Sequence, residues 1–231
     1  MNGSELEDLC TEINGGDSIG TTLLTSLLNT AKSMVEELRP WMVLRATDTS
    51  KTVYTSGTWQ TAIDLSTITR FNRFYESTSA PIKLFDGNNG IEPYYLRPFE
   101  DRLYLKDINN TCVYDDANQD LYLNGRPSFS GTLYINHIKN TPDIDLSSSS
   151  SVWSFPTYAH PLLAFMAVAI HKGGIDFDTV NERMAPENRA TAATILKTLE
   201  MWDNQKQLSV ISSRDPYGER GDYRSNAINI E

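Results

Sequence analysis

An apolar stripe near the start of the chain constrains the fold most. Between residues 19 and 38, large apolar side chains recur every three, four or seven positions, which predicts one face of an amphipathic helix. Asp17 or Ser18 is placed to cap its start, Pro40 ends it, and Trp41 is expected to fold back onto it. An isolated helix of this length is marginal in water, so another part of the chain must cover the stripe.

Two further helical patterns lie far downstream. Segment 161–170 is apolar almost all round and is followed by two glycines at 173–174, which predicts a buried, central helix. A final helix is predicted over 186–207, because apolar residues again recur at helical spacing and Pro186 suits a first turn. Its predicted inner face consists of Ala192, Ile195, Leu196, Leu199 and Trp202. The polar residues 209–231 are expected to form a tail.

The segment between these helical patterns has a different period. Short runs of aromatic and β-branched residues are separated by Asn, Asp, Gly and Pro, which is typical of strands and turns. These runs occupy residues 58–65, 70–75, 82–85 and 131–138. Residues 112–114 and 121–123 flank an acidic turn and predict a hairpin. We expect an antiparallel β-region of about six to eight strands.

The predicted organisation is therefore an α+β fold. A small helical bundle, with one N-terminal and two C-terminal helices, carries a large inserted antiparallel β-region and an extended C-terminal tail. The boundaries are 1–50 for an N-terminal arm and the first helix, 51–140 for the β-region, 141–154 for a serine-rich linker, 155–208 for the remaining helices and 209–231 for the tail.

Charge and cysteine usage narrow the functional class. The formal net charge of −10 argues against a surface that grips nucleic acid, because phosphate binding uses clustered Lys and Arg. No apolar run approaches the ~18 residues that cross a bilayer, and the acidic start does not resemble a signal peptide, so folding in a cytosol is expected. Cys10 and Cys112 lie far apart, which favours two free thiols.

Catalytic and metal-binding motifs are not found in the sequence. It has no P-loop, dinucleotide-binding glycine motif or Gly-x-Ser-x-Gly elbow. His137, His160 and His171 show no metal-ligand spacing, and the last two are expected at helix ends. No catalytic, cofactor-binding or metal-binding residue is predicted, and the chain is not expected to be an enzyme.

Two other features have a structural and a functional interpretation. Residues 116–120 open like an EF-hand loop, but Leu121 and Pro127 replace its required glycine and glutamate, which favours an acidic hairpin turn. The chain has eleven tyrosines, and those at positions 94, 95, 104, 114, 122 and 134 all fall in the β-region. They suit a sheet core, an interface or a sugar-binding platform, so a carbohydrate-binding module is an alternative function.

Several loose motifs resemble a known family. Leu-Arg-Pro-Trp at 38–41 ends the first helix, and Gly-Thr-Trp-Gln-Thr-Ala-Ile-Asp-Leu at 57–65 follows it in the β-region. Asn-Thr-Pro-Asp-Ile stands at 140–144, and Phe-Pro-Thr-Tyr-Ala-His-Pro-Leu-Leu at 155–163 opens the central helix. This order resembles the head-to-tail adaptor (connector) proteins of tailed bacteriophages, which dock beneath the portal. The resemblance covers about residues 20–215, and it rests on pattern and layout.

The resemblance implies a virion structural protein without a cofactor. Its subunits would form a ring, usually dodecameric, that joins the portal protein to a tail or nozzle protein in the virion neck, after assembly in the host cytoplasm. The C-terminal tail would reach the portal, with Arg214, Tyr217, Arg220, Tyr223 and Arg224 as docking candidates. A negative channel wall would let DNA pass without trapping it. Another tail or fibre-attachment subunit is the structural alternative.

Overall fold

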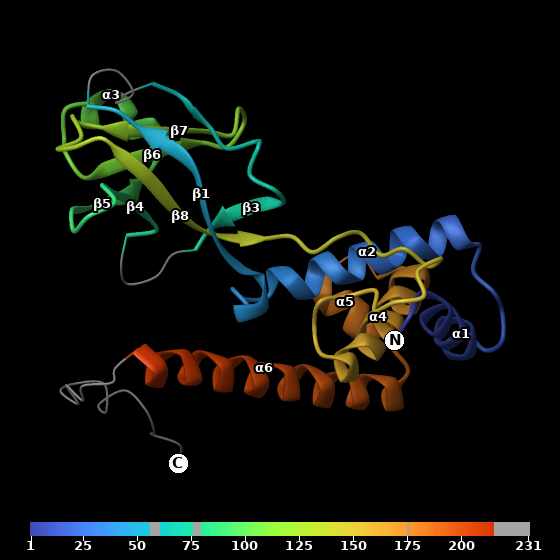
Figure 1. Cartoon of the computed structure of the whole chain (residues 1–231). Coiled ribbons are helices and arrows are strands. Elements are labelled where there is room, and N and C mark those ends of the chain that lie inside the picture. Colours follow the sequence, from blue (N-terminus) through green and yellow to red (C-terminus); the bar gives the residue numbers. More distant parts are fainter. Residues whose placement is uncertain (56–60, 76–79, 175, 215–231) are drawn as a thin grey trace, which may run out of the picture.

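Helices and strands segregate into two parts of this α+β protein. The structure, a computed structural model, describes residues 1–55, 61–75, 80–174 and 176–214. The helical part contains α1, α2 and α4–α6, and the sheet part contains β1–β8 together with the short helix α3 (Figure 1). The chain passes from the helical part into the sheet part at β1 and returns after β8, so two strands link the parts.

The central helix of the helical part is α4 (His160–His171), as predicted. It packs against α1 (Gly3–Ile13), α2 (Thr21–Glu37), α5 (Phe177–Arg183) and α6 (Pro186–Arg214). Eight of its twelve residues are buried, which explains why its sequence is apolar on nearly every side. The first stripe returns to the central helix as predicted, because α2 packs against α4.

The ends of α2 only partly match the sequence-based prediction. Gly20 occupies the N-cap position with no side-chain hydrogen bond, so the prediction of Asp17 or Ser18 was wrong. These residues instead belong to the loop after α1, where the Asn14 side chain donates to the Asp17 carbonyl at 2.9 Å. At the other end, Trp41 does fold back: its ring is fully buried and its Nε1 donates to the Val35 carbonyl at 2.8 Å.

The predicted number of helices was wrong. Residues 3–13 form α1, which has a capping box between Asn2 and Glu5 and buries Leu6 and Cys10. Residues 177–183 form α5, which Asp176 caps through a hydrogen bond from the Thr179 amide at 2.8 Å. The described residues therefore contain two N-terminal and three C-terminal α-helices around the sheet part, and the arm is in fact helical.

Two boundary predictions also require correction. Helix α6 continues to Arg214, so residues 209–214 are helical and do not belong to an extended tail. The linker 141–154 contains no helix or strand, but Ile144, Leu146, Val152 and Trp153 are buried in the helical core. The serines between them lie at the surface, which is why the segment looks like a simple linker in the sequence.

Within the described residues, eight strands form a sheet in the order β1-β8-β4-β5-β6-β7-β2, and β3 pairs with β8 beside β4. The bounds are β1 Arg45–Val53, β2 Ile63–Asp64, β3 Phe71–Phe74, β4 Ile82–Phe85, β5 Ile91–Arg97, β6 Thr111–Asp115, β7 Asp120–Asn124 and β8 Gly131–Lys139. Strand β1 starts before the predicted boundary at 51. The region is also not purely antiparallel, because β5 and β6 pair in parallel through an excursion that contains α3.

The sheet curls around its own apolar core. Each described strand contributes at least one buried side chain, among them Val53, Ile82, Tyr94, Leu123 and Leu133. The predicted hairpin is confirmed, with Cys112 opposite Leu123 and Tyr114 opposite Leu121. Its acidic turn is closed by the Asp115 carboxylate, which accepts from two amides of the turn. Among the described helices, none is long and apolar enough to cross a membrane.

Candidate functional site at the junction of helices and sheet

A polar stripe on α2 holds the chain where it leaves β8. The stripe consists of Asn29, Lys32 and Glu36, which lie on one face because their spacing follows the helical repeat. Lys32 Nζ donates to the carbonyls of Thr141 (3.1 Å) and Pro142 (2.9 Å) and lies 3.3 Å from Asp143 Oδ1. Asn29 Oδ1 accepts from the Ile144 amide at 2.9 Å.

Glu36 completes a clamp, formed by Asn29, Lys32 and Glu36, that binds the segment after β8. Its carboxylate accepts from the Thr141 amide at 3.3 Å, from the Thr141 hydroxyl, and from Trp153 Nε1 at 2.9 Å. Lys32 and Glu36 are each only 3% exposed, so both charges are removed from water. A buried charge is costly unless hydrogen bonds compensate for the lost hydration, and here each charged group has several partners.

An aromatic cluster lies beside this clamp. Trp153 stacks on Phe155 at a centroid distance of 4.1 Å, and Trp41 meets Phe155 edge-on at 5.6 Å. His160 is fully buried 5.9 Å from Trp153, and its Nε2 donates to the Phe155 carbonyl at 3.0 Å. Its Nδ1 lies 3.2 Å from the Met1 nitrogen and accepts from it. These bonds fit a neutral imidazole, and burial lowers its pKa.

Helix α6 is fastened to the same junction by Asp203. Its carboxylate, fully buried, accepts from the Met42 amide at 2.6 Å and forms an ion pair with Arg39 at 3.2 Å. The Arg39 guanidinium also lies over the Trp41 ring, 5.2 Å from its centroid. Sequence reasoning missed Asp203, although its position one helical turn after Leu199 places it on the inner face of the helix.

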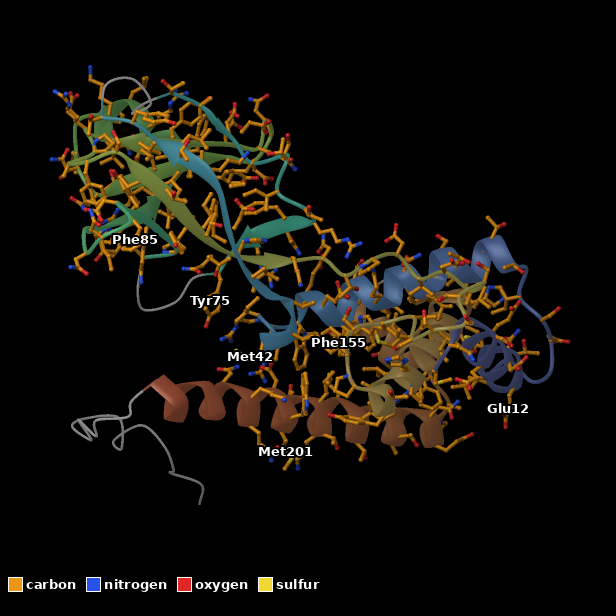
Figure 2. All side chains as sticks on the ribbon, in the orientation of Figure 1. Glu12, Met42, Tyr75, Phe85, Phe155 and Met201 are labelled. Atoms are coloured by element: carbon orange, nitrogen blue, oxygen red, sulfur yellow. The ribbon has the colours of Figure 1, made fainter. Side chains whose placement is uncertain are left out.

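An open groove lies on the sheet side of the junction. It has a volume of about 580 Å³ and is lined by Pro40, Asn72, Arg73, Phe74, Tyr75, Leu96, Tyr114, Asp116 and Ile138. Figure 2 shows Tyr75 at the side of the sheet part that faces Met42 and the helical part. The rings of Phe74 and Tyr114 meet at 5.1 Å and give the groove a rigid aromatic wall.

The predicted docking residues fall largely outside the described ranges. Arg214 is the last residue of α6, and Tyr217, Arg220, Tyr223 and Arg224 lie beyond it. The structure therefore does not bring this set together. The remaining sequence candidates have ordinary surroundings: His137 lies buried in β8, and the exposed His171 ends α4.

Two properties of the titratable groups concern metal binding and thiol reactivity. No three His, Cys, Asp or Glu side chains lie there in a group that could hold a metal ion. Cys10 and Cys112 are free, and burial raises the pKa of each thiol to about 12, which suppresses the reactive thiolate. The buried charged groups instead make structural contacts. Lys32 and Glu36 on α2 bind the segment 141–153, and Asp203 on α6 binds the segment 39–42.

No family model matches the chain, and no curated protein matches its sequence.

Proposed function

We propose that this chain is a structural protein of the virion of a tailed bacteriophage, a head-to-tail adaptor without enzymatic activity. Its copies form a ring that joins the portal to a tail protein and lines the channel through which DNA leaves. One observation carries the proposal. Three of the four segments that resemble adaptor proteins lie at the junction: 38–41 contacts α2 and α6, 140–144 contacts α2, and Phe155 of 155–163 meets Trp41 of the first segment.

The junction suits a subunit that must hold a fixed shape. The two parts have separate cores, so their relative position depends on the linking strands and on the junction contacts. Lys32, Glu36 and Asp203 supply directional hydrogen bonds there, and directional contacts define one geometry more narrowly than apolar packing alone. An adaptor needs a fixed shape, because it connects two other rings of the virion.

Helix α6 gives the proposed docking tail its starting point. Its outer side is open, with Met201 55% exposed and pointing away from the helical core (Figure 2). In the proposal, residues 215–231 leave its end and bind the portal, using the arginines and tyrosines at positions 217, 220, 223 and 224 as anchors. Tyr and Arg are effective anchors because they combine a large buried area with directional hydrogen bonds.

The acidic composition has a role in the same proposal. A ring of chains with a net charge of −10 each would present a negative wall to DNA, and repulsion of phosphate keeps the DNA moving. A channel surface that proves neutral or basic in the assembled ring would contradict this part.

The carbohydrate-binding alternative gains little from the tyrosines. Of the six tyrosines considered for a platform, Tyr94 is fully buried, and the exposed Tyr95, Tyr104 and Tyr134 lie on three different elements, β5, α3 and β8. A sugar platform needs neighbouring exposed rings. We therefore keep glycan binding as an outcome of the test below.

Co-sedimentation with the portal protein of the same phage genome tests the proposal. We compare the full chain, a chain lacking residues 215–231, and a control in which the same 17 residues are scrambled. The proposal predicts that only the full chain sediments with the portal. Binding to tail components alone would favour a tail or fibre-attachment subunit, and binding on a glycan array with no portal binding would favour the carbohydrate module.

A further inference from the structure

The excursion between β5 and β6 exposes large apolar side chains. We call residues 98–108 the knob; they include a 3₁₀ turn and α3 (Arg102–Leu105), neither of which buries any residue. Leu103 is 80% exposed and Tyr104 86%, and Phe99 and Ile108 beside them are 38% and 49% exposed. A group of large apolar residues presented to water in this way is typical of an interaction surface.

The knob is nevertheless held in a defined position. The Arg102 guanidinium lies over the Tyr122 ring of β7, 3.5 Å from its centroid. The Lys106 carbonyl accepts from the Gly125 amide at 2.7 Å, and the Leu105 carbonyl accepts from the Ile108 amide at 2.9 Å. Because these contacts order the knob before any partner arrives, binding through Leu103 and Tyr104 would cost little further conformational entropy.

The groove described above has the complementary character. Most of its lining is apolar or aromatic, and its volume of about 580 Å³ lies within the range of sites that enclose a few large groups. Its rim carries one charge of each sign, Arg73 and Asp116, both exposed. The knob also carries both signs: Glu100 and Asp101 precede the apolar pair, as does Arg102, which lies over Tyr122, and Lys106 and Asp107 follow it. Apolar centres and mixed-charge rims therefore match on the two surfaces.

The positions of the knob and groove decide how they can meet. In Figure 1, α3 lies at the upper left of the sheet part, whereas β3, which lines the groove, lies at its lower right. Leu96 of the groove lies only two residues before the knob, but the Arg102–Tyr122 contact and the hydrogen bond from the Gly125 amide hold the knob in place, so a chain does not turn its own Leu103 and Tyr104 into its own groove. Contact between copies through these two different surfaces is head-to-tail, and repetition of such a contact closes into a ring or continues as a filament.

We infer that the knob of one copy binds in the groove of the next copy and that this contact joins neighbouring subunits. The inference deepens the proposed ring and rests on that proposal, because it names the surfaces through which the ring would form. Leu103 and Tyr104 of one copy then lie against Tyr75, Leu96 and Tyr114 of its neighbour. Arg73 can pair with an acidic residue of the entering knob, and Asp116 with a basic one.

Disulfide trapping tests the contact in the full chain. The background is low because Cys10 and Cys112 are only 1% and 0% exposed. Tyr104→Cys marks the knob, Arg73→Cys marks the groove rim, and Met201→Cys, on the outer side of α6, is the exposed control. We expect a cross-linked dimer when Tyr104→Cys is mixed with Arg73→Cys. A variant that carries both Tyr104→Cys and Arg73→Cys should give a ladder of oligomers. Tyr104→Cys mixed with Met201→Cys should give no product.

A charge on the knob should also weaken self-association. Leu103→Asp introduces a carboxylate at the apolar centre of the contact, and we expect at least about a tenfold rise in the dissociation constant by sedimentation velocity. The matched control is Leu23→Asp, on the exposed side of α2, where the side chain is 49% exposed and lies far from the knob and the groove. Equal effects of the two substitutions would overturn the inference.

The outcomes separate this inference from the proposed function. Portal binding or ring formation without the knob–groove cross-link would overturn the inference and leave the adaptor proposal standing. A ladder from the double variant without portal binding would support the contact and contradict the adaptor role. Cross-linking of Tyr104→Cys to itself, in place of Arg73→Cys, would show a two-fold knob-to-knob contact and overturn the head-to-tail arrangement.

Discussion

The helical and sheet parts are held together by different means. In the helical part, Lys32, Glu36 and Asp203 are buried charges that connect segments far apart in the sequence. In the sheet part, strand pairing sets the positions of the backbone, and the one buried charged residue described there is Glu92, whose carboxylate accepts from the Tyr94 hydroxyl and the Ser128 amide. Helices packed through apolar stripes can slide or rotate, whereas paired strands have a fixed register. Three of the four buried charged residues in the described part of the chain, and the three least exposed, therefore lie in the part that lacks another source of register.

The largest effect should follow the loss of Glu36. Glu36→Ala leaves the Thr141 amide and hydroxyl and Trp153 Nε1 without their acceptor, at a cost of about 1–3 kcal/mol for each unsatisfied buried group, so we expect about 4 kcal/mol less stability. Urea unfolding followed by tryptophan fluorescence measures this, since Trp41, Trp153 and Trp202 belong to the helical core. The exposed neighbour Glu37→Ala is the control. Equal effects of both substitutions would show that the clamp is unimportant.

A cavity in the sheet core should be somewhat less costly. Leu133→Ala removes a fully buried side chain from β8, and we expect a loss of about 3 kcal/mol. If the two cores unfold separately, far-ultraviolet circular dichroism should report an earlier transition, while the fluorescence of Trp41, Trp153 and Trp202, recorded in a Trp59→Phe background, changes little. A concerted shift of both signals would mean that the junction couples the two parts into one unfolding unit.

A smaller effect is expected from Asp203→Asn. The amide oxygen can still accept from the Met42 amide, but the ion pair with Arg39 is lost, and we expect a cost of about 1–2 kcal/mol. Amide hydrogen exchange should rise in residues 39–42 and in α6 around position 203, and remain unchanged in the sheet part. If the substitution changed amide exchange equally throughout the helical part, the role given to Asp203 would be contradicted.

The smallest effect concerns pH. Burial lowers the pKa of His160 below its ordinary 6.5, so the unfolded chain binds a proton at a pH where the folded chain does not. Stability should therefore be constant above about pH 6.5 and fall as the pH drops below it. His160→Gln should remove this slope, and the exposed His171→Gln should keep it, as measured by urea midpoints at several pH values. The same slope in all three chains would contradict a neutral, buried His160.

The sequence predicted elements whose periodicity is strong. The stripe of α2, the all-round apolar α4 and the inner face of α6 follow the helical repeat, and the acidic turn between Tyr114 and Leu121 is correctly placed. Helix α1 was missed because few of its residues are buried, although the Asn2–Glu5 capping box was a usable signal. Strand β1 starts unpredicted at Arg45 because its sequence is polar and much of it is exposed.

The candidate site was less predictable than the elements. The motifs at 38–41, 140–144 and 155–163 were recognised, but nothing in them indicates that they meet. Their partners are Lys32, Glu36 and Asp203, charged residues on helix faces that otherwise look apolar. A charge at an inner helix position signals a buried polar contact, but its partner depends on long-range packing, which local patterns do not encode.

Imaging of the complex with the portal tests the central claim most directly. The protein is mixed with the portal of the same genome and viewed by negative-stain electron microscopy, beside the chain that lacks residues 215–231. The account predicts a ring of this protein capping the narrow end of the portal, absent with the shortened chain. A portal that stays bare at high concentrations of the full chain would contradict the adaptor role.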